Sequence, residues 1–488
     1  MSTMHDPRWL QAERSASTLP SEIWRWRAVD IATQVRVRSV SCVEVLKAFQ
    51  RRIDSVNPQL NAIVHDDRER ALETARRADV LLRSAPHEAG ILHGVPLTVK
   101  LNVDVAGEAT TNGNPAYADR IAEADSSVVV NLRSAGANII GRSNVPPFSF
   151  RWFTENPLYG RTLNPWRADI TSGGSSGGAA VSVATGMCAL AHGTDIAGSI
   201  RYPAYVNGVV GLRTTPGRVP AYHPTVGQRF FGHQAMSAQG PMARSVADVL
   251  LGLRAMTAAD TRDPTWVDAR LEHADDLSAV KVALVDEVPG ATVSAEIKTA
   301  LREAADALAE AGYLIERAHP PEIEQCVDVW QSIVMTEVRL GMISAADSME
   351  DPDIKRSIHN MADCAPIVDL EGYVRALARR DELRRKWNKF LGRYPIVLLP
   401  VSCRPPQPWG ADLGTIEEMR ELIAAQSPMI ATAALGLPGI SVPMGLSVGL
   451  PVGVQLVADS FRELRLLAAA SFIERDKGGT SALDYEAD

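Results

Sequence analysis

Three residues, Lys100, Ser175 and Ser199, have types and surroundings suited to acyl-transfer chemistry. Both serines stand in glycine-rich backbone, one in GGSSGG at 173–178 and the other in GTDIAGSIR at 193–201. A serine hydroxyl is a weak nucleophile that needs a base. A lysine can be that base if burial keeps it neutral, and Lys100 ends the apolar run GVPLTVK at 94–100. Together these residue types can hydrolyse an amide without a histidine, a metal or a cofactor.

The segment that carries Ser199 also has the composition of an oxyanion hole. Such a site needs N–H groups aimed at one point beside the nucleophile. Ile196, Ala197, Gly198 and Ser199 offer four successive N–H groups, and the small residues at 197 and 198 let the backbone curl around a carbonyl oxygen. We therefore predict that Ile196, Ala197 and Gly198 form this hole together with the N–H of Ser199 itself.

The glycine-rich run at 173–178 allows other interpretations. Its apolar flanks disfavour a flexible linker, and no Gly-Lys-Ser/Thr follows, so the pattern of a phosphate-binding loop fails. The run does satisfy G-x-S-x-G, the nucleophile elbow of α/β-hydrolases, which would make Ser176 the nucleophile of an esterase. That alternative needs a downstream acid and a histidine, and no later histidine has a recognisable flanking signature.

The chain around these residues alternates between strand and helix patterns, which indicates an α/β fold. Strands are expected at 95–100, 137–141, 280–285, 313–316, 395–399 and 453–457, and helices at 126–134 and 294–312. Residues 317–390 are mostly helical in pattern, and core-like strands return after them. This order predicts one large domain with an inserted helical cap.

Composition excludes several classes of protein. Apolar residues make up 46% and charged residues 22% of the 488 residues, and the net charge of −8 disfavours nucleic acid or an anionic membrane as the main partner. The five cysteines form no C-x-x-C pair, which argues against a disulfide framework and a zinc site. The apolar stretch at 435–458 is broken by prolines and glycines, so it predicts buried strands rather than a membrane span. With a polar N-terminus, the expectation is a soluble cytoplasmic protein.

With these motifs the chain resembles the amidase signature family of Ser–cisSer–Lys hydrolases. The resemblance rests on GVPLTVK at 94–100, GGSSGG at 173–178, GTDIAGSIRYP at 193–203, GVVGLRTTPGRVP at 208–220, GPMARSVADV at 240–249 and GLPGISVP at 436–443. Motifs recur from about residue 25 to 475. The resemblance implies a mixed central β-sheet covered by helices on both faces. The expected division is an N-terminal arm at 1–25, one amidase signature domain at 26–475 with its cap at about 317–390, and a tail at 476–488.

The resemblance also assigns roles. Ser199 would be the acyl-forming nucleophile, Ser175 the bridging serine held by a cis peptide bond after Gly174, and Lys100 the base that drives the proton relay. Supporting roles fall to Gly174, Ser176, Asp195 and Arg201, of which Asp195 and Arg201 would hold the loop by hydrogen bonds and charge pairing. No cofactor and no metal are implied.

Two positions depart from the family pattern. The family usually has Asp after the lysine, where this chain has Leu101, and Gly where it has Ala197. The stretch after Leu101 fits a branch that includes indoleacetamide-type hydrolases. The Ala197 methyl is small, so we expect the oxyanion hole to form, with a narrower acyl site.

The expected activity is hydrolysis of a small or medium neutral amide, with an anilide or a carbamate open to the same acyl chemistry. Phe148, Ser149, Trp152 and the cap segment 330–342 are candidate pocket walls. Two further alternatives are the glutaminase-like subunit of a tRNA-dependent amidotransferase, disfavoured by Leu101 and TTNG at 110–113, and a non-enzymatic binding module. The expected partners are the amide and water, and an exposed N-terminal helical region could support a homodimer.

Overall fold

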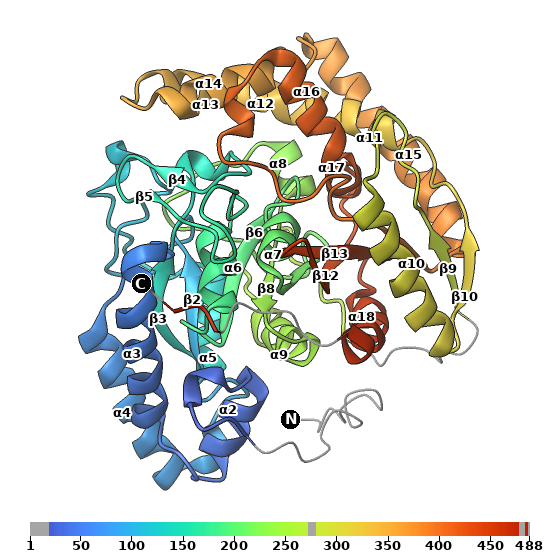
Figure 1. The fold of residues 1–488 in the computed structure, drawn as a ribbon. Coiled ribbons are helices and arrows are strands. Elements are labelled where there is room, and N and C mark those ends of the chain that lie inside the picture. The colour runs from blue at the N-terminus through green and yellow to red at the C-terminus, as the bar shows by residue number, and fades with distance from the viewer. Residues whose placement is uncertain (1–18, 272–279, 478–483, 487–488) are drawn as a thin grey trace.

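The computed structural model describes residues 19–271, 280–477 and 484–486, and an eleven-stranded mixed sheet forms their centre (Figure 1). The strands follow the order β1-β3-β2-β6-β8-β7-β12-β13-β11-β9-β10. Their bounds are β1 Ile63–His65, β2 Pro96–Lys100, β3 Asn138–Ser143, β6 Leu190–Asp195, β7 Val210–Arg213, β8 Ala238–Ala243, β9 Lys281–Leu284, β10 Leu314–Arg317, β11 Ile396–Pro400, β12 Gly439–Ser447 and β13 Leu450–Val457. A separate two-stranded sheet pairs β4 Glu155–Asn156 with β5 Gly160–Arg161.

Strand register brings the carboxyl ends of β2 and β6 together. These strands are parallel, with Leu97 opposite Leu190 and Thr98 opposite Ala191. Strand β2 is buried along its whole length, which explains its β-branched and apolar sequence. The two strands therefore deliver Lys100 and the segment that begins at Thr194 to the same edge of the sheet.

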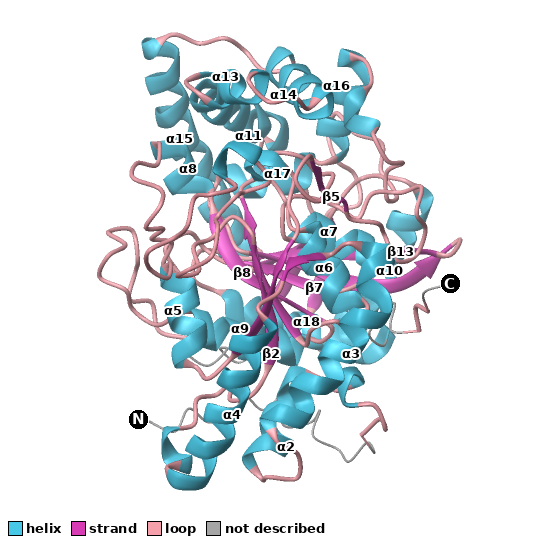
Figure 2. Cartoon of the chain, turned by 90° about the vertical axis from the view of Figure 1, so that its left-hand side faces the viewer, coloured by secondary structure: helices cyan, strands magenta, loops and turns pink. Residues whose placement is uncertain are grey.

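Helices cover both faces of the sheet (Figure 2). Helices α6 and α7 lie against one face, and α9 and α18 lie against the other. The bounds are α2 Ala28–Arg36, α3 Cys42–Leu60, α4 Arg68–Ser84, α5 Ser127–Ser134, α6 Gly177–Ala184, α7 Arg201–Asn207, α8 Phe231–Met236, α9 Val246–Met256, α10 Ala295–Glu310, α11 Ile323–Trp330, α12 Thr336–Arg339, α13 Met342–Asp347, α14 Pro352–Asp363, α15 Leu370–Arg393, α16 Ile416–Ala425, α17 Ser427–Ala434 and α18 Glu463–Lys477. The mixed sheet between two helical layers confirms the predicted fold class.

The predicted strands and helices are present, and their ends differ from the predicted ones by at most three residues. The segment 317–390 is mostly helical: its helices run from α11, which begins at Ile323, to α15, which continues to Arg393. In both views the helices α11 to α17 lie together in the upper part of the molecule, above the central strands of the sheet (Figures 1 and 2). Of the expected arm at 1–25, residues 1–18 lie outside the described residues, as does most of the expected tail. The described part of the tail packs on α3, where the Tyr485 hydroxyl donates to Gln59 Oε1 at 2.8 Å.

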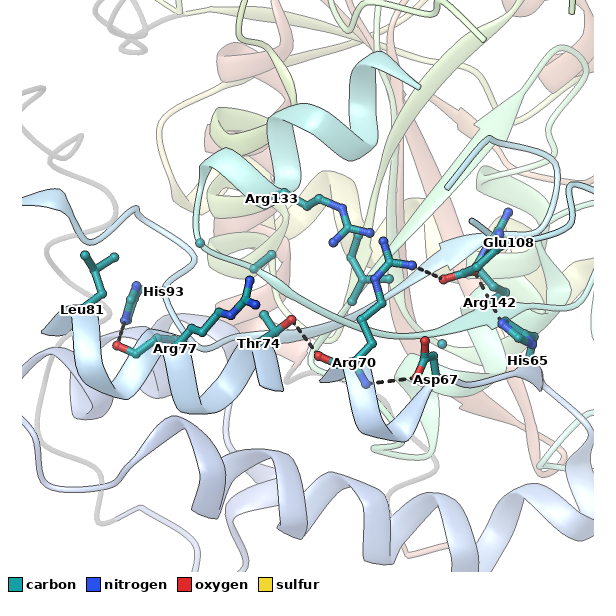
Figure 3. A pocket seen from close by; sticks show the side chains of 15 residues that line it. His65, Asp67, Arg70, Thr74, Arg77, Leu81, His93, Glu108, Arg133 and Arg142 are labelled. Atoms are coloured by element: carbon teal, nitrogen blue, oxygen red, sulfur yellow. Dashed lines mark hydrogen bonds and ion pairs between the residues drawn. The ribbon is translucent and has the colours of Figure 1, made fainter. Parts of the chain in front are cut away.

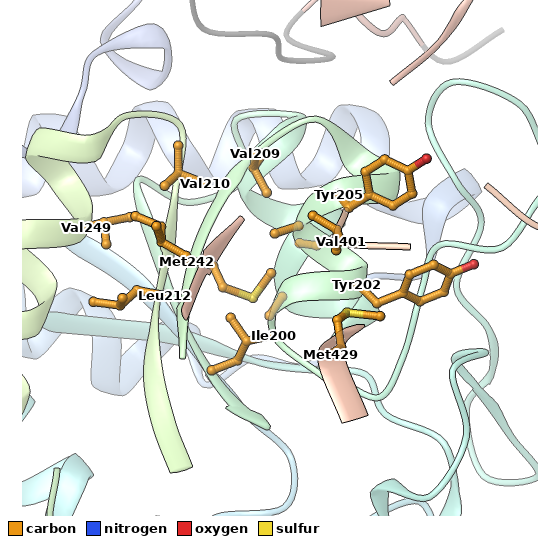
Figure 4. Packing of buried hydrophobic residues seen from close by; sticks show 14 of the residues in the cluster. Ile200, Tyr202, Tyr205, Val209, Val210, Leu212, Met242, Val249, Val401 and Met429 are labelled. Carbon is orange, nitrogen blue, oxygen red and sulfur yellow. The ribbon is translucent and has the colours of Figure 1, made fainter. Parts of the chain in front are cut away.

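Helix α7 lies in the middle of the hydrophobic core. Ile200, Tyr202 and Tyr205 are buried, and Met242 of β8 and Met429 of α17 pack around them (Figure 4). Side chains in a close-packed protein interior are held in defined rotamers. The segment that precedes α7, which carries Ser199, is therefore attached to a rigid support. Over the described residues, no helix has both the length and the apolarity to cross a membrane.

Candidate active site

Lys100 is wholly buried at the end of β2. Its Nζ lies 2.7 Å from Ser175 Oγ and 2.8 Å from Thr194 Oγ1. The Thr194 hydroxyl also accepts from Asn102 Nδ2 at 3.2 Å. Burial lowers the pKa of Lys100 well below 10.5, and the charge of Asp195, which acts in the opposite direction, is the weaker influence. The structure thus favours the neutral amine beside a serine hydroxyl.

Ser175 follows Gly174 across a cis peptide bond, as the family resemblance implied. Glycine is required at 174 because the backbone of residues 151–153 runs against it. A Cβ there would lie 2.3 Å from the carbonyl oxygen of Arg151, a distance that side chains do not tolerate. The close approach presses the segment of Ser175 against the segment of Trp152.

The two serine segments are joined directly. The N–H of Ser176 donates to the carbonyl oxygen of Ser199 at 3.2 Å. The Ser176 hydroxyl is buried between the backbone N–H and carbonyl of Thr194, each at 3.4 Å. No described histidine is hydrogen-bonded to Ser176, so the geometry of a nucleophile elbow is missing in the described chain. Ser199 is 7% exposed and Ser175 only 1%, which leaves Ser199 the more accessible of the two.

Asp195 is the charge centre of the segment that carries Ser199. Its carboxylate accepts from the N–H groups of Gly198 at 2.8 Å and Ile200 at 3.2 Å, and pairs with Arg201 at 3.0 Å and Arg213 at 3.3 Å. Burial alone would raise the pKa of Asp195, but the two guanidinium groups outweigh it and hold this pKa below its usual range. The fully buried carboxylate is therefore ionised, and it fixes the backbone turn on which Ser199 stands.

Within the described chain, the structure leaves three of the four N–H groups of the predicted oxyanion hole without an acceptor and corrects the prediction for Gly198. Among the described residues no acceptor faces the N–H groups of Ile196, Ala197 and Ser199. The N–H of Gly198 is not free, because it donates to Asp195. The prediction included Gly198 because sequence shows successive N–H groups without their directions. Glycine is still needed at 198, where φ is +103° and a Cβ would lie 2.6 Å from Met429 Sδ.

The predicted pocket-wall residues Trp152, Phe148 and Ser149 differ in how they relate to the site. Trp152 reaches the segment that carries Ser199, where its indole N–H donates to the Ala197 carbonyl at 3.1 Å. Phe148 and Ser149 lie in the short helix η5 Pro147–Ser149 and both have a φ of +56°. Ser149 donates to Asn112 Oδ1 at 2.8 Å, and over the described chain no hydrogen bond links this turn to Lys100, Ser175 or Ser199.

Two residues that had no role in the sequence analysis lie at the site: Thr194 binds Lys100, and Arg213 pairs with Asp195. Trp330, the first residue of the predicted pocket-wall segment 330–342, donates to the Ile196 carbonyl at 3.0 Å. Thr194 and Arg213 stand inside motifs that the resemblance used, so their position in a motif was the available signal. The departure Leu101 is buried and uncharged, and it adds no negative charge that would raise the pKa of Lys100.

A cavity of about 400 Å³ lies between α4 and β3, apart from this site (Figure 3). Arginines line it, but each has a carboxylate partner. Arg70 and Arg142 share Glu108 at 3.1 and 2.9 Å, and Arg133 pairs with Asp125 at 3.0 Å. Arg77 is paired with Glu73. The cavity therefore offers no unpaired guanidinium to an anionic ligand.

Comparison with known proteins identifies the family of the chain. The Amidase family model matches residues 44–467. The chain is 42% identical over 459 residues to indoleacetamide hydrolase of Bradyrhizobium diazoefficiens, covering 93% of this chain and 87% of that protein. It is 32% identical over 468 residues to one subunit of the glutamyl-tRNA(Gln) amidotransferase of Nitratidesulfovibrio vulgaris, covering 90% and 94%. The crystal structure of a bacterial aryl acylamidase of the amidase signature family superposes with a TM-score of 0.80 at 25% identity, covering 94% of this chain and 98% of that one.

The chain belongs to the amidase family and has the amidase signature fold. Its activity is hydrolysis of carbon–nitrogen bonds in amides other than peptides, which excludes a non-catalytic binding module.

Replacing Asp195 by Asn should destabilise the protein by about 3–5 kcal/mol, because Arg201 and Arg213 would remain buried without a counter-charge. Urea unfolding measures this loss. Glu371→Gln is the matched control: it breaks an exposed pair with Arg375 and should cost less than about 1 kcal/mol. Equal losses in the two variants would contradict the central role given to Asp195.

Lys100→Met should change how stability depends on pH. Because the pKa of Lys100 is lowered in the fold, the unfolded chain binds a proton that the folded chain does not, between the folded pKa and about 10.5. The unfolding free energy of the wild type should therefore rise with pH in that window, and the variant should lack this rise. Chemical unfolding at several pH values compares the two, with the exposed Lys47→Met as control. Parallel pH profiles for wild type and Lys100→Met would rule out the burial effect.

Proposed function

We propose that Ser199 is the nucleophile of this amidase, Ser175 its proton relay and Lys100 its base. Neutral Lys100 accepts the proton of Ser175, and Ser175 accepts the proton of Ser199 as Ser199 Oγ bonds to the amide carbon. The carbonyl electron pair moves to the oxygen, which the N–H groups of Ile196, Ala197 and Ser199 stabilise. The C–N bond then breaks, and the proton returns through Ser175 to the leaving nitrogen.

The second half of the cycle uses the same relay. Water loses a proton through Ser175 to Lys100 while its oxygen bonds to the acyl carbon. The C–O bond to Ser199 breaks, the hydroxyl takes back the proton, and the acid leaves. One water is consumed, and one acid and one amine or ammonia are released.

The observation that carries this proposal is the buried amine of Lys100 at 2.7 Å from Ser175 Oγ. A charged amine would be costly in this position, and the lowered pKa of Lys100 supports a base. Thr194 supports the same role, because a neutral amine can donate to Thr194 and still accept the Ser175 proton through its lone pair.

For the substrate we propose a small neutral amide with an aromatic acyl group, with indole-3-acetamide as the first compound to test. The 42% identity to indoleacetamide hydrolase supports this class. Two tryptophans, Trp152 and Trp330, border the nucleophile segment, and the charged groups Asp195 and Arg201 beside it are paired with each other. Anilides and carbamates are the next compounds, since the acyl chemistry is the same.

The glutaminase-like role within an amidotransferase is the second candidate, supported by the 32% identical relative. Release of ammonia from glutamine, in preference to indole-3-acetamide, would favour it. The amide and water are the proposed partners of the reaction. The homodimer and the cytoplasmic location stay predictions.

Ser199→Ala should abolish both amide turnover and labelling by phenylmethylsulfonyl fluoride, because it removes the attacking oxygen. Ser176→Ala tests the alternative nucleophile: it loses two weak backbone contacts and should remain labelled and active. Intact-mass spectrometry and ammonia release measure the two effects. Labelling that survives in Ser199→Ala and disappears in Ser176→Ala would overturn the assignment.

The rate should rise with pH along an acidic limb set by Lys100, because only the neutral amine accepts a proton. Burial lowers the pKa of His192 in β6 to about 3, so this fully buried histidine cannot produce a limb at higher pH. Measurement of kcat/KM for indole-3-acetamide from about pH 5 to about pH 10 tests this. A rate that falls as pH rises across the whole range would contradict the lysine base.

A further inference from the structure

Two indole groups hold successive carbonyls of the segment that carries Ser199. The indole N–H of Trp330 donates to the Ile196 carbonyl at 3.0 Å, and that of Trp152 donates to the Ala197 carbonyl at 3.1 Å. Both side chains are almost fully buried, with 3% exposure each. Buried indole N–H groups normally have an acceptor, but here both acceptors lie in one short turn beside the proposed nucleophile.

A hydrogen bond to a peptide carbonyl also fixes the direction of the N–H group in the same peptide. The carbonyl and the N–H of one trans peptide lie in a plane and point in opposite directions. Among the described residues only the Gly174–Ser175 bond is cis, so the peptides after Ile196 and Ala197 are trans. The bond from Trp330 to Ile196 therefore sets the direction of the Ala197 N–H.

The two peptides differ in how they are held. The peptide between Ala197 and Gly198 is bound at both ends, by Trp152 at its carbonyl and by Asp195 at its N–H. The peptide between Ile196 and Ala197 is bound only at its carbonyl, by Trp330, and in the described chain its N–H meets no acceptor. Trp330 thus directs an N–H that is free to bind a substrate oxygen.

The position of Trp330 is itself fixed by packing. It is the last residue of α11, directly before the π-helical turn η6 Gln331–Met335. Turns of this kind are frequent at functional sites. Helix α11 packs on α17, and Met429 of α17 contacts the nucleophile segment at Gly198. Helix α17 therefore contacts both the helix that carries the Trp330 indole and the segment that carries Ser199.

We infer that Trp330 is a positioning residue for the reaction, which aims the Ala197 N–H at the oxyanion through the Ile196 carbonyl. The inference rests on the proposed role of Ser199 and names a determinant outside the motifs of the family resemblance. Its location in the predicted cap segment means that the cap contributes to catalytic geometry as well as to the wall of a pocket.

Trp330→Phe tests the inference because it removes the N–H and keeps an aromatic ring. The expected result is a loss of about 10-fold to about 100-fold in kcat for indole-3-acetamide, with little change in KM. The second-order rate of inactivation by phenylmethylsulfonyl fluoride should fall by a similar factor, because the attacked sulfonyl oxygen needs the same N–H group. Trp330 replaced by 3-benzothienylalanine, which keeps the bicyclic ring and lacks the N–H, gives the same test if Trp330→Phe does not fold.

Trp387→Phe is the matched control. It removes a buried indole N–H that donates to the Pro321 carbonyl at 2.7 Å, at the other end of α11 and away from Ser199. Its kcat and inactivation rate should equal those of the wild type. Equal losses in both variants, or no loss in the Trp330 variants, would overturn the inference. A wild type that neither turns over an amide nor labels at Ser199 would instead mean that the proposed function itself is wrong.

Discussion

The site depends on one buried carboxylate that is shared by two arginines. Asp195 ends β6, and its side chain turns back to bind the N–H groups of the segment that carries Ser199. The pairs with Arg201 and Arg213 make the charge tolerable in a fully buried position. Arg201 extends the arrangement to Thr432 of α17 and Gln455 of β13, both through its Nη1. The conformation of one turn is thereby tied to two distant parts of the sheet and its helices.

Burial disfavours the charged form of both Asp195 and Lys100, but only Asp195 has partners that outweigh this effect. Asp195 keeps its charge because two cations contact it. Among the described residues, only hydroxyl groups lie within hydrogen-bonding distance of Lys100, and its pKa is shifted toward the neutral form. The same low-polarity interior thus supplies a fixed anion for structure and an uncharged amine for proton transfer. The separation of these roles needs only that the arginines contact the aspartate and not the lysine.

Much of this arrangement could be predicted from sequence because it is local. The strand at Lys100, the glycine-rich turns and the alternation of elements follow from periodicity and from residues such as Gly174. The direction of individual N–H groups could not be predicted, and Gly198 was assigned a free N–H that Asp195 in fact binds. Trp330 was only one of several residues in a candidate segment, because its contact with Ile196 spans 134 positions of the chain. Contacts of that range depend on how helices pack, which a single sequence does not reveal.

The partners of Arg201 imply an order of assembly during synthesis. Gln455 lies in β13, which pairs with β12 and β11 and is the last strand of the sheet along the chain. The turn beside Ser199 cannot acquire its full set of contacts until the ribosome has released Gln455, which stands 254 positions after Arg201. Such long-range contacts slow folding, because a large loop must close before they contribute stability. A nascent chain that stops before β13 would contain Lys100, Ser175 and Ser199 and still lack part of the frame that orients them.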